Sequence, residues 1–274
     1  SSITMNMTDG LTPEDWYDLR ASGTTHIVST SGLHVLIAAL GFLFLLTRTE
    51  LPRPVQIGLL ILFLLVYGSA AGLRPPVIRA VIMISVSLGA YLFRRGADLL
   101  SALALAGIVT LLLAPWSAFT LGFQLSIAAV SGLVLFGGDL SSDFKGWSAV
   151  RIVGDLFRRY MRTAGVVTLA VTPLIAFHYG EVPIVSVLAN VLIVPCLGVV
   201  VIGTMASWVL SKLPWISSLI LETVVKPFIW WIDLVIEWAA RIPTLAVPAF
   251  HAYWLVVLYA ACFALWRPRV RLPD

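Results

Sequence analysis

Residues 184–210, IVSVLANVLIVPCLGVVVIGTMASWVL, decide the fold, because the whole stretch contains no charged side chain. About 20 predominantly apolar residues are enough for a helix to cross the hydrocarbon core of a bilayer. The stretch is therefore predicted to be a membrane-spanning helix. Pro195 lies inside it and predicts a kink or a break. Such a break is tolerated at membrane depth where protein or a water-filled cavity satisfies the freed backbone groups.

The rest of the chain repeats this apolar pattern. Hydrophobic residues make up 59% of the 274 positions and charged residues only 12%, whereas a soluble domain carries roughly 25% charged residues. About eight apolar runs are long enough to span a bilayer; they cover 27–47, 55–72, 76–93, 98–115, 119–137, 163–179, 184–210 and 250–266. We expect an all-α, polytopic integral membrane helical bundle of about eight spans, with interfacial amphipathic helices and broken or re-entrant helices.

Polar segments divide the chain into consecutive parts. Thr12-Pro13-Glu14-Asp15 is a capping sequence that predicts the start of a short interfacial helix. The predicted order is an extracytoplasmic lead-in with this helix (1–25), spans one to five (26–137), a cytoplasmic loop with a basic amphipathic helix (138–162), spans six and seven (163–210), an amphipathic helix region (211–249), and the last span with a basic tail (250–274).

The orientation follows from the basic loops, because cytoplasmic loops carry an excess of Lys and Arg. The loops predicted to be cytoplasmic contain Arg48, Arg53, Arg94, Arg95, Lys145, Arg151, Arg158, Arg159 and Arg162. The N-terminus is then outside. An eight-span count also places the basic tail at Arg267, Arg269 and Arg271 outside, against its charge. If the helix around Glu222 spans as well, the chain crosses the membrane once more and the basic tail lies in the cytoplasm, in agreement with its charge. Both span counts stay open.

The amphipathic region carries a narrow polar stripe. Glu222, Lys226, Asp233 and Glu237 fall within about 60° of one another on a helix of 100° per residue. This helix either lies flat in the membrane interface or lines a cavity. We favour the interface.

Three polar constellations stand out from the apolar background. They are His26-Ile27-Val28-Ser29-Thr30-Ser31-Gly32-Leu33-His34, Leu73-Arg74-Pro75-Pro76-Val77-Ile78-Arg79-Ala80, and Leu121-Gly122-Phe123-Gln124-Leu125-Ser126 with Ser131-Gly132-Leu133. Ionisable residues inside apolar runs are costly, since an arginine at the centre of a span costs about 2.5–3.5 kcal/mol on insertion scales. Each constellation is therefore a candidate functional site.

In this order, the three blocks resemble the competence domain of the ComEC family of DNA-internalisation proteins. A fourth match is Pro173 to Phe177, with the Ala189-Asn190 pair before Pro195, and Thr30 departs from the aliphatic residue expected there. The resemblance covers nearly the whole chain. It implies one competence domain that forms an inner-membrane channel passing single-stranded DNA into the cytoplasm during natural transformation.

The resemblance also implies what lies elsewhere. Members of this family carry an OB-like domain before the region and often a metallo-β-lactamase-like domain after it, and neither is recognised in these residues. No Walker A loop is present either. We therefore expect no cofactor, no metal and no enzymatic activity in this chain. Its expected partners are single-stranded DNA, the lipid bilayer and a separate cytoplasmic motor or DNA-binding proteins.

For each candidate DNA-path residue, a structural role is the alternative to a role in the path. His26, Ser31 and His34 form either a satisfied polar cluster or part of a pore wall. Arg79 either extends to the membrane face, or faces the path or pairs with carbonyls of a neighbouring helix. Gln124 and Ser131 act either as contacts between helices or as path-lining groups. Asn190 either caps a broken helix or offers its amide to a passing base or phosphate. The arginines of the cytoplasmic basic helix are Arg151, Arg158, Arg159 and Arg162.

Two other function classes remain open. A small-molecule or ion-coupled transporter usually carries a carboxylate at mid-span, and the acidic residues here lie at run ends or in the doubtful helix. An intramembrane serine hydrolase would use Ser31 with His34 or His178. The nucleophile pattern G-x-S-x-G is absent because residue 29 is serine. Cys196 and Cys262 lie in apolar runs and are predicted to be small buried hydrophobic residues.

Overall fold

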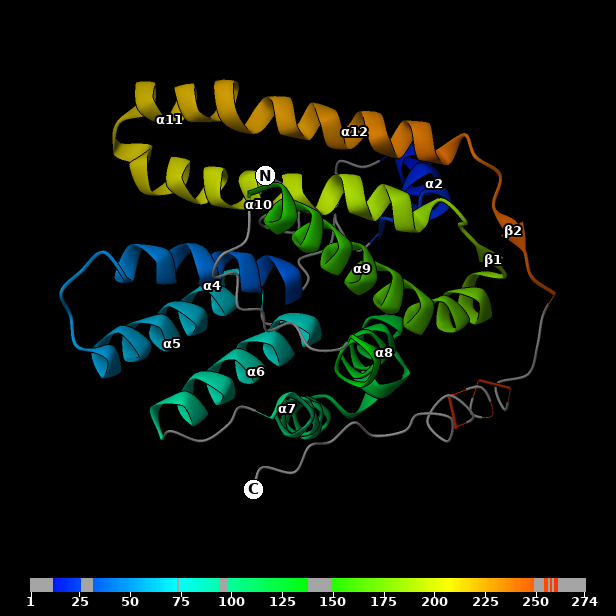
Figure 1. The fold of residues 1–274 in the computed structure, drawn as a ribbon, viewed down its shortest axis with the longest axis horizontal. Coiled ribbons are helices and arrows are strands. Elements are labelled where there is room, and N and C mark those ends of the chain that lie inside the picture. Colours follow the sequence, from blue (N-terminus) through cyan, green and yellow to red (C-terminus); the bar gives the residue numbers. More distant parts are fainter. Residues whose placement is uncertain are drawn as a thin grey trace.

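The computed structural model describes residues 12–25, 32–72, 74–93, 98–137 and 149–248, with 254, 255, 257, 259 and 260. This part is built of helices, which confirms the predicted all-α class (Figure 1). The α-helices are α2 (Pro13–Ala21), α4 (Gly32–Leu46), α5 (Arg53–Ala70), α6 (Pro75–Leu92), α7 (Leu99–Leu113), α8 (Leu121–Phe136), α9 (Ala149–Tyr179), α10 (Ser186–Val209), α11 (Pro214–Ile220) and α12 (Lys226–Ala240).

Short elements connect these helices. The 3₁₀ turns are η1 (Pro115–Phe119) and η2 (Leu210–Lys212), and η3 (Leu221–Val225) is a π-helical turn between α11 and α12. Strands β1 (Glu181–Val182) and β2 (Leu245–Ala246) pair antiparallel, with Glu181 opposite Ala246. The chain after α12 therefore returns to the point where α10 begins.

Helix α2 begins at the predicted capping sequence. The Thr12 hydroxyl accepts a hydrogen bond from the Asp15 N–H, and the Asp15 carboxylate accepts from the Thr12 backbone N–H. Hydrogen bonds from the backbone and the hydroxyl of Thr12 hold the pKa of Asp15 below its ordinary value of 3.8. Helix α2 packs against α12.

Helices α4, α5 and α6 pack around a small apolar core. Val35 from α4, Leu64 from α5 and Val77 from α6 are fully buried there. Prolines stand at the first or second position of α5 and α6, where a missing N–H leaves no hydrogen bond unmade. The predicted polar breaks between the apolar runs are thus real helix starts.

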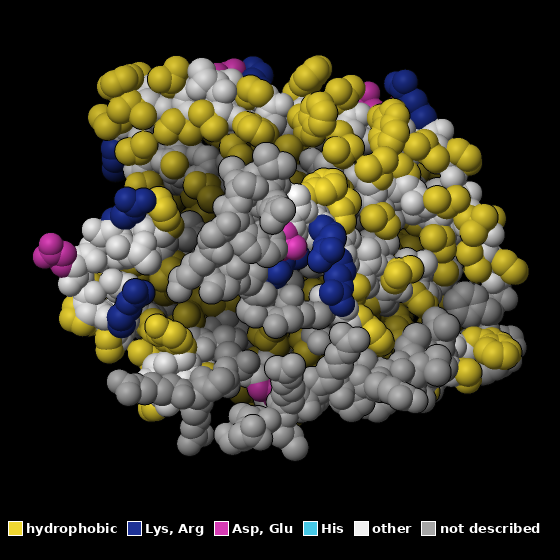
Figure 2. Space-filling model, viewed as in Figure 1, with side chains coloured by type: hydrophobic (Ala, Val, Ile, Leu, Met, Phe, Trp, Pro, Cys, Tyr) yellow, Lys and Arg dark blue, Asp and Glu magenta, His cyan; other side chains and the backbone are white. Residues whose placement is uncertain are grey.

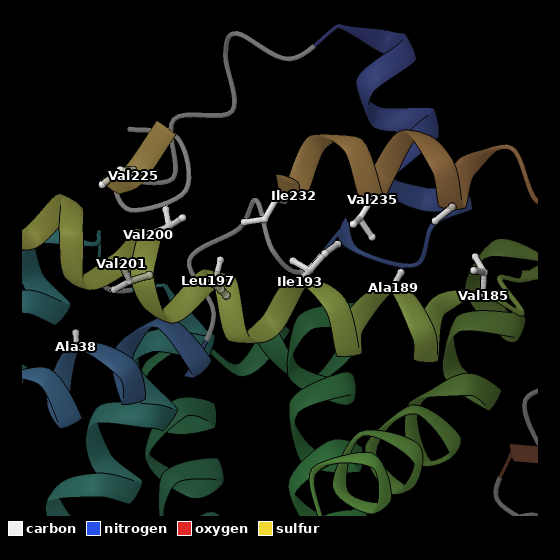
Figure 3. Packing of buried hydrophobic residues seen from close by; sticks show 11 residues of the cluster. Ala38, Val185, Ala189, Ile193, Leu197, Val200, Val201, Val225, Ile232 and Val235 are labelled. Carbon is white, nitrogen blue, oxygen red and sulfur yellow. The ribbon is translucent and has the colours of Figure 1, made fainter. Parts of the chain in front are cut away.

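Helices α11 and α12, joined by η3, run back along α10 (Figure 1). Val200 and Leu197 of α10 meet Val225 and Ile232 of the returning segment, and all four are at most 2% exposed (Figure 3). Such close packing holds helices together in lipid, where burial from water contributes little. The polar stripe lies on the outer surface, since the Glu222 and Lys226 side chains are 64% and 71% exposed.

Of the kink or break predicted at Pro195, the break is wrong, because α10 continues from Ser186 to Val209. Proline removes the N–H that would bond the carbonyl four residues earlier, which is Val191 O. The hydroxyl of Tyr160 on α9 donates to that oxygen at 3.2 Å. A neighbouring helix thus replaces the missing donor, and the helix has no need to break.

Helix α9 joins two segments that the sequence separates. It runs unbroken from Ala149 to Tyr179, so the predicted basic helix and the sixth span form one element. Pro173 lies inside it, and the Tyr259 hydroxyl donates to Ala170 O at 2.7 Å. The carbonyl that loses its helical donor at Pro173 is Leu169 O, so this hydrogen bond lies one residue away and does not replace the missing one.

Fewer helices than eight meet the length of a span. Within the described residues, four helices are long and apolar enough: Arg53–Ala70, Pro75–Leu92, Gly154–Tyr179 and Ser186–Lys212. Three shorter apolar helices accompany them, Gly32–Leu46, Leu99–Leu113 and Leu121–Phe136. The fourth run ends early because the residue before Pro115 is disfavoured in a helix. Residues 27–31 of the first run, and most of 250–266, lie outside the described residues.

The outer surface of the bundle is apolar. Leu112 and Trp116 are 77% and 82% exposed, and many other large hydrophobic side chains are exposed with them. Figure 2 shows such side chains spread over the face formed by α10, α11 and α12. Exposed apolar surface this extensive marks contact with a membrane, as the composition predicts.

Candidate functional site

An arginine is buried where α6 meets α8. Arg79 lies one turn into α6 and is 1% exposed. Its Nε donates to Ser126 Oγ at 3.2 Å, and its Nη2 donates to Gly122 O at 2.8 Å. Its Cζ lies 4.7 Å from the centroid of the Phe123 ring, within the range of a cation–π interaction. The second and third sequence blocks therefore meet at this guanidinium.

The charge of Arg79 has no carboxylate partner among the described residues. The ion pairs in this part of the chain join Arg158 and Arg159 to Asp155, and Lys226 to Glu222. Nη1 of Arg79 is buried without a hydrogen-bond partner. The positive end of the α6 dipole is also an unfavourable place for a cation. The site thus holds a buried positive charge that its surroundings do not neutralise.

The first sequence block reaches the same place. A Cβ built on Gly32 would lie 3.3 Å from the Cβ of Ala80, the residue after Arg79. A Cβ on Gly122 would lie 3.8 Å from Cγ of Pro76. The N-terminal ends of α4, α6 and α8 therefore converge, and three blocks that are far apart in sequence come together around one arginine. We call this the Arg79 junction.

His34 is fully buried on α4, two residues after Gly32. Residues two apart do not share a helix face, so the contact of Gly32 with Ala80 does not bring His34 to Arg79. His26 and Ser31 lie outside the described residues, so their predicted grouping with His34 stays a prediction. Within the described part of the chain, no group of three or more His, Cys, Asp or Glu residues could hold a metal ion.

Gln124 and Ser131 lie on α8. The Gln124 amide donates to Ala118 O at 3.2 Å, so it ties the start of α8 to η1. Ser131 is half-buried and precedes Gly132, where a Cβ would lie only 2.5 Å from the Cβ of Ala170. Gln124 is thus close in sequence to the arginine contacts, whereas Ser131 lies beside the α8–α9 packing contact.

Asn190 lies at a second polar contact, between α9 and α10. The Tyr160 hydroxyl lies 3.3 Å from Asn190 O and 3.2 Å from Val191 O. The side-chain Oδ1 of Asn190 is buried without a hydrogen-bond partner. We call this the Tyr160 junction. The structure does not bring Asn190 to the Arg79 junction.

The predicted basic helix forms the first half of α9. The Arg158 side chain is 83% exposed and lies 3.8 Å from Asp155, which also pairs with Arg159. Nη2 of Arg162 donates to Phe136 O at 3.4 Å, at the end of α8. Arg151 lies on the same helix, but its side chain is outside the described residues. Asp155 therefore offsets part of the positive charge predicted for this face.

The sequence did not single out three of the residues that make these contacts. Phe123 and Ser126 stand inside the third block and surround Arg79. Ser126 follows Gly122 by four residues and Phe123 by three, which was a usable signal, because residues three or four apart share a helix face. Tyr160 has no such signal, since only the packing of α9 on α10 shows which carbonyl it reaches.

Comparison with known proteins agrees with this arrangement of blocks. A family model described as Competence protein matches residues 3–271. ComE operon protein 3 of Bacillus subtilis (strain 168) is 30% identical over 223 residues, which cover 81% of this chain and 26% of that protein. Competence protein ComA of Neisseria gonorrhoeae is 29% identical over 230 residues, covering 80% of this chain and 30% of that protein. The chain spans less than a third of both relatives. No solved structure matches it.

Proposed function

The chain belongs to the competence protein family, and on this premise we propose that it forms the passage by which single-stranded DNA crosses the bacterial inner membrane during natural transformation. The family and the two relatives support a role in DNA uptake. The observation that carries the finer proposal is the Arg79 junction. It places a buried cation inside an otherwise apolar bundle.

A DNA passage must meet opposed requirements. The strand carries one negative charge per nucleotide and needs donors and aromatic or apolar surface for its bases. It must also be released, so each contact has to be weak. A junction with one guanidinium, one hydroxyl and one aromatic ring meets both requirements, because a densely basic wall would hold the strand.

We assign conduction to this chain and place strand cleavage and force generation elsewhere. A phosphate-cradling loop is absent from the sequence, so a separate motor on the cytoplasmic side supplies the pulling force. The predicted orientation supports this direction of transport. It puts the starts of α4, α6 and α8, and hence the Arg79 junction, on the extracytoplasmic half, where the strand arrives.

The pairing of β1 with β2 supports one choice of topology. Glu181 and Ala246 lie opposite each other, so the chain is on the same side of the membrane before α10 and after α12. This holds whether the α10–α12 hairpin spans or lies in the interface. With the N-terminus outside, one further span then places the basic tail at Arg267, Arg269 and Arg271 in the cytoplasm, as the positive-inside rule requires.

Substitution of Arg79 tests the function. In the naturally transformable host, Arg79→Ala should lower transformation frequency by about 10- to 100-fold, because a hydrogen bond to a charged group contributes about 1.5–3 kcal/mol. Arg74→Ala is the matched control, since Arg74 is an exposed arginine five residues earlier on the chain. Membrane levels of each variant are measured by immunoblot. Wild-type transformation by Arg79→Ala at normal membrane level would remove the Arg79 junction from the DNA path.

Cysteine labelling tests the topology. Glu181→Cys and Thr244→Cys should react with a membrane-impermeant maleimide from the outside of intact cells, and Arg158→Cys should not. Labelling of the first two positions from opposite sides would contradict the pairing of β1 with β2.

A further inference from the structure

We propose that the Arg79 junction is a binding site for a single phosphate group, taken in passage from the backbone of the strand. The inference rests on the proposed function, since it names the part of the DNA that the passage contacts. It starts from the donors of the junction that have no acceptor.

One nitrogen of the Arg79 guanidinium has no hydrogen-bond acceptor. Nε and Nη2 of Arg79 are used by Ser126 and Gly122, and Nη1 is buried without a partner. A buried donor left unpaired costs about 1–3 kcal/mol, and more when it is charged. An acceptor that also carries negative charge removes this cost and neutralises the guanidinium.

The start of α8 adds further donors. Thr120 is the N-cap residue, but its side chain makes no cap hydrogen bond. Its hydroxyl donates instead to Ser117 O at 2.7 Å. The N–H of Phe123 bonds Thr120 O at 3.1 Å, so the N–H groups left for an anion at this helix start are those of Leu121 and Gly122.

The turn before α8 carries another unpaired group. Ser117 Oγ in η1 is buried without a hydrogen-bond partner, and Gln124 fastens η1 to α8. The dipoles of α4, α6 and α8 also have their positive ends at this place. The charge of Arg79 and the dipoles of the three helices therefore favour an anion at the junction, and no ion pair in the described residues joins a carboxylate to Arg79.

The α6 side explains why an arginine is needed. Pro75 and Pro76 occupy the first two positions of this helix and have no N–H to offer. The next N–H, on Val77, bonds Arg74 O at 2.9 Å. Helix α6 can thus contribute to anion binding through its dipole and through the Arg79 side chain, whose fork geometry suits phosphate oxygens.

Binding is measured on the purified protein in lipid nanodiscs. Inorganic phosphate is titrated at constant ionic strength against chloride, with thermal unfolding and ³¹P NMR line width as readouts. We expect saturable binding of phosphate by the wild type, loss of binding in Arg79→Gln, and wild-type binding in the control Arg74→Gln. Absence of saturable binding by the wild type, or unchanged affinity in Arg79→Gln, overturns the site.

A second pair of variants covers the case in which Arg79→Gln does not fold. Arg79→Lys keeps the charge but loses the fork, so phosphate affinity should fall about tenfold. Ser126→Ala releases Nε from its internal acceptor, so affinity should rise by a factor of about three. Wild-type affinity in both variants overturns the site.

The source of the phosphate is tested with short oligothymidylates. A strand with its natural backbone should displace inorganic phosphate, whereas one with an uncharged methylphosphonate backbone should not. Equal displacement by both strands shows recognition of bases and overturns the assignment to the backbone. Displacement by neither assigns the site to free phosphate and likewise overturns it.

These results separate the site from the function. If the wild type binds phosphate and Arg79→Ala transforms normally, the phosphate site is real but has no part in DNA transport. Failure of phosphate binding together with lost transformation keeps the passage and overturns the phosphate site.

Discussion

The Arg79 junction and the Tyr160 junction both join two helices, the first through a charged side chain and the second through a neutral one. Both join two membrane helices through a polar side chain that donates to backbone carbonyls. Arg79 reaches Gly122 O with a cation, whereas Tyr160 reaches Val191 O with a neutral hydroxyl. The Arg79 junction is left with an unused donor, and the Tyr160 junction with an unused acceptor, Asn190 Oδ1.

This difference separates a structural contact from a functional one. The Tyr160 contact has a local reason, since Pro195 leaves Val191 O without its helical donor. The carbonyl that Arg79 bonds has no proline four residues later, because residue 126 is Ser126. A neutral side chain would join α6 and α8 at lower cost than a buried cation. This contrast supports the proposal that the charge of Arg79 serves a ligand rather than packing.

The contact between α8 and α9 links the two junctions, and its disruption should have the largest effect on stability. Gly132→Ala would place a Cβ 2.5 Å from that of Ala170, so the helices must move apart. We expect a loss of about 2 kcal/mol, measured as the unfolding midpoint in detergent. In Gly165→Ala, nothing lies within 4 Å of the new Cβ, and stability should stay equal or rise. Equal losses in both variants would contradict close packing at Gly132.

A feature of the fold or of the site could be predicted where it depends on residues close in sequence, and not where it depends on a contact between different helices. The apolar runs and the α2 cap are local, and the sequence predicts them correctly. Arg79 could be chosen because its cost is visible within one apolar run. The continuity of α10 could not be predicted, since the donor that replaces the Pro195 N–H comes from Tyr160, on another helix.

The span count failed for a related physical reason. Hydropathy registers how apolar a run is, but helix length also depends on where prolines and turns end it, as Pro115 does for α7. Asn190 lies apart from the Arg79 junction, and its assignment to the DNA path stays a prediction. Its block aligns with the others in order, yet its carbonyl packs against α9.

The second prediction tests whether the Tyr160 junction is structural. Tyr160→Phe leaves Val191 O without its side-chain donor, and we expect a loss of about 1 kcal/mol in unfolding free energy with little change in transformation. Tyr91→Phe is the control, because Tyr91 is 63% exposed. A loss of transformation without a loss of stability would make the Tyr160 junction functional and remove the contrast between the two.

A double-mutant cycle makes this test sharper. Pro195→Ala restores the N–H that bonds Val191 O within α10. Tyr160→Phe should then cost almost nothing in the Pro195→Ala background, and the coupling between the two positions should be about 1 kcal/mol. An unchanged cost would show that Tyr160 contributes through packing rather than through this hydrogen bond.

The smallest effect on stability and transformation is expected at Arg162. Like Arg79 it bonds a carbonyl of α8, but its side chain is exposed rather than buried. Its Nη2 also donates to a carbonyl of α8, but at 3.4 Å and in an exposed position. Exposed contacts of charged groups contribute about 0–1 kcal/mol, so Arg162→Gln should leave the unfolding midpoint and the transformation frequency near wild type. A large loss of transformation at normal stability would instead place DNA on the basic half of α9. The Arg79 junction would then be one of two sites where this protein meets the charge of the strand.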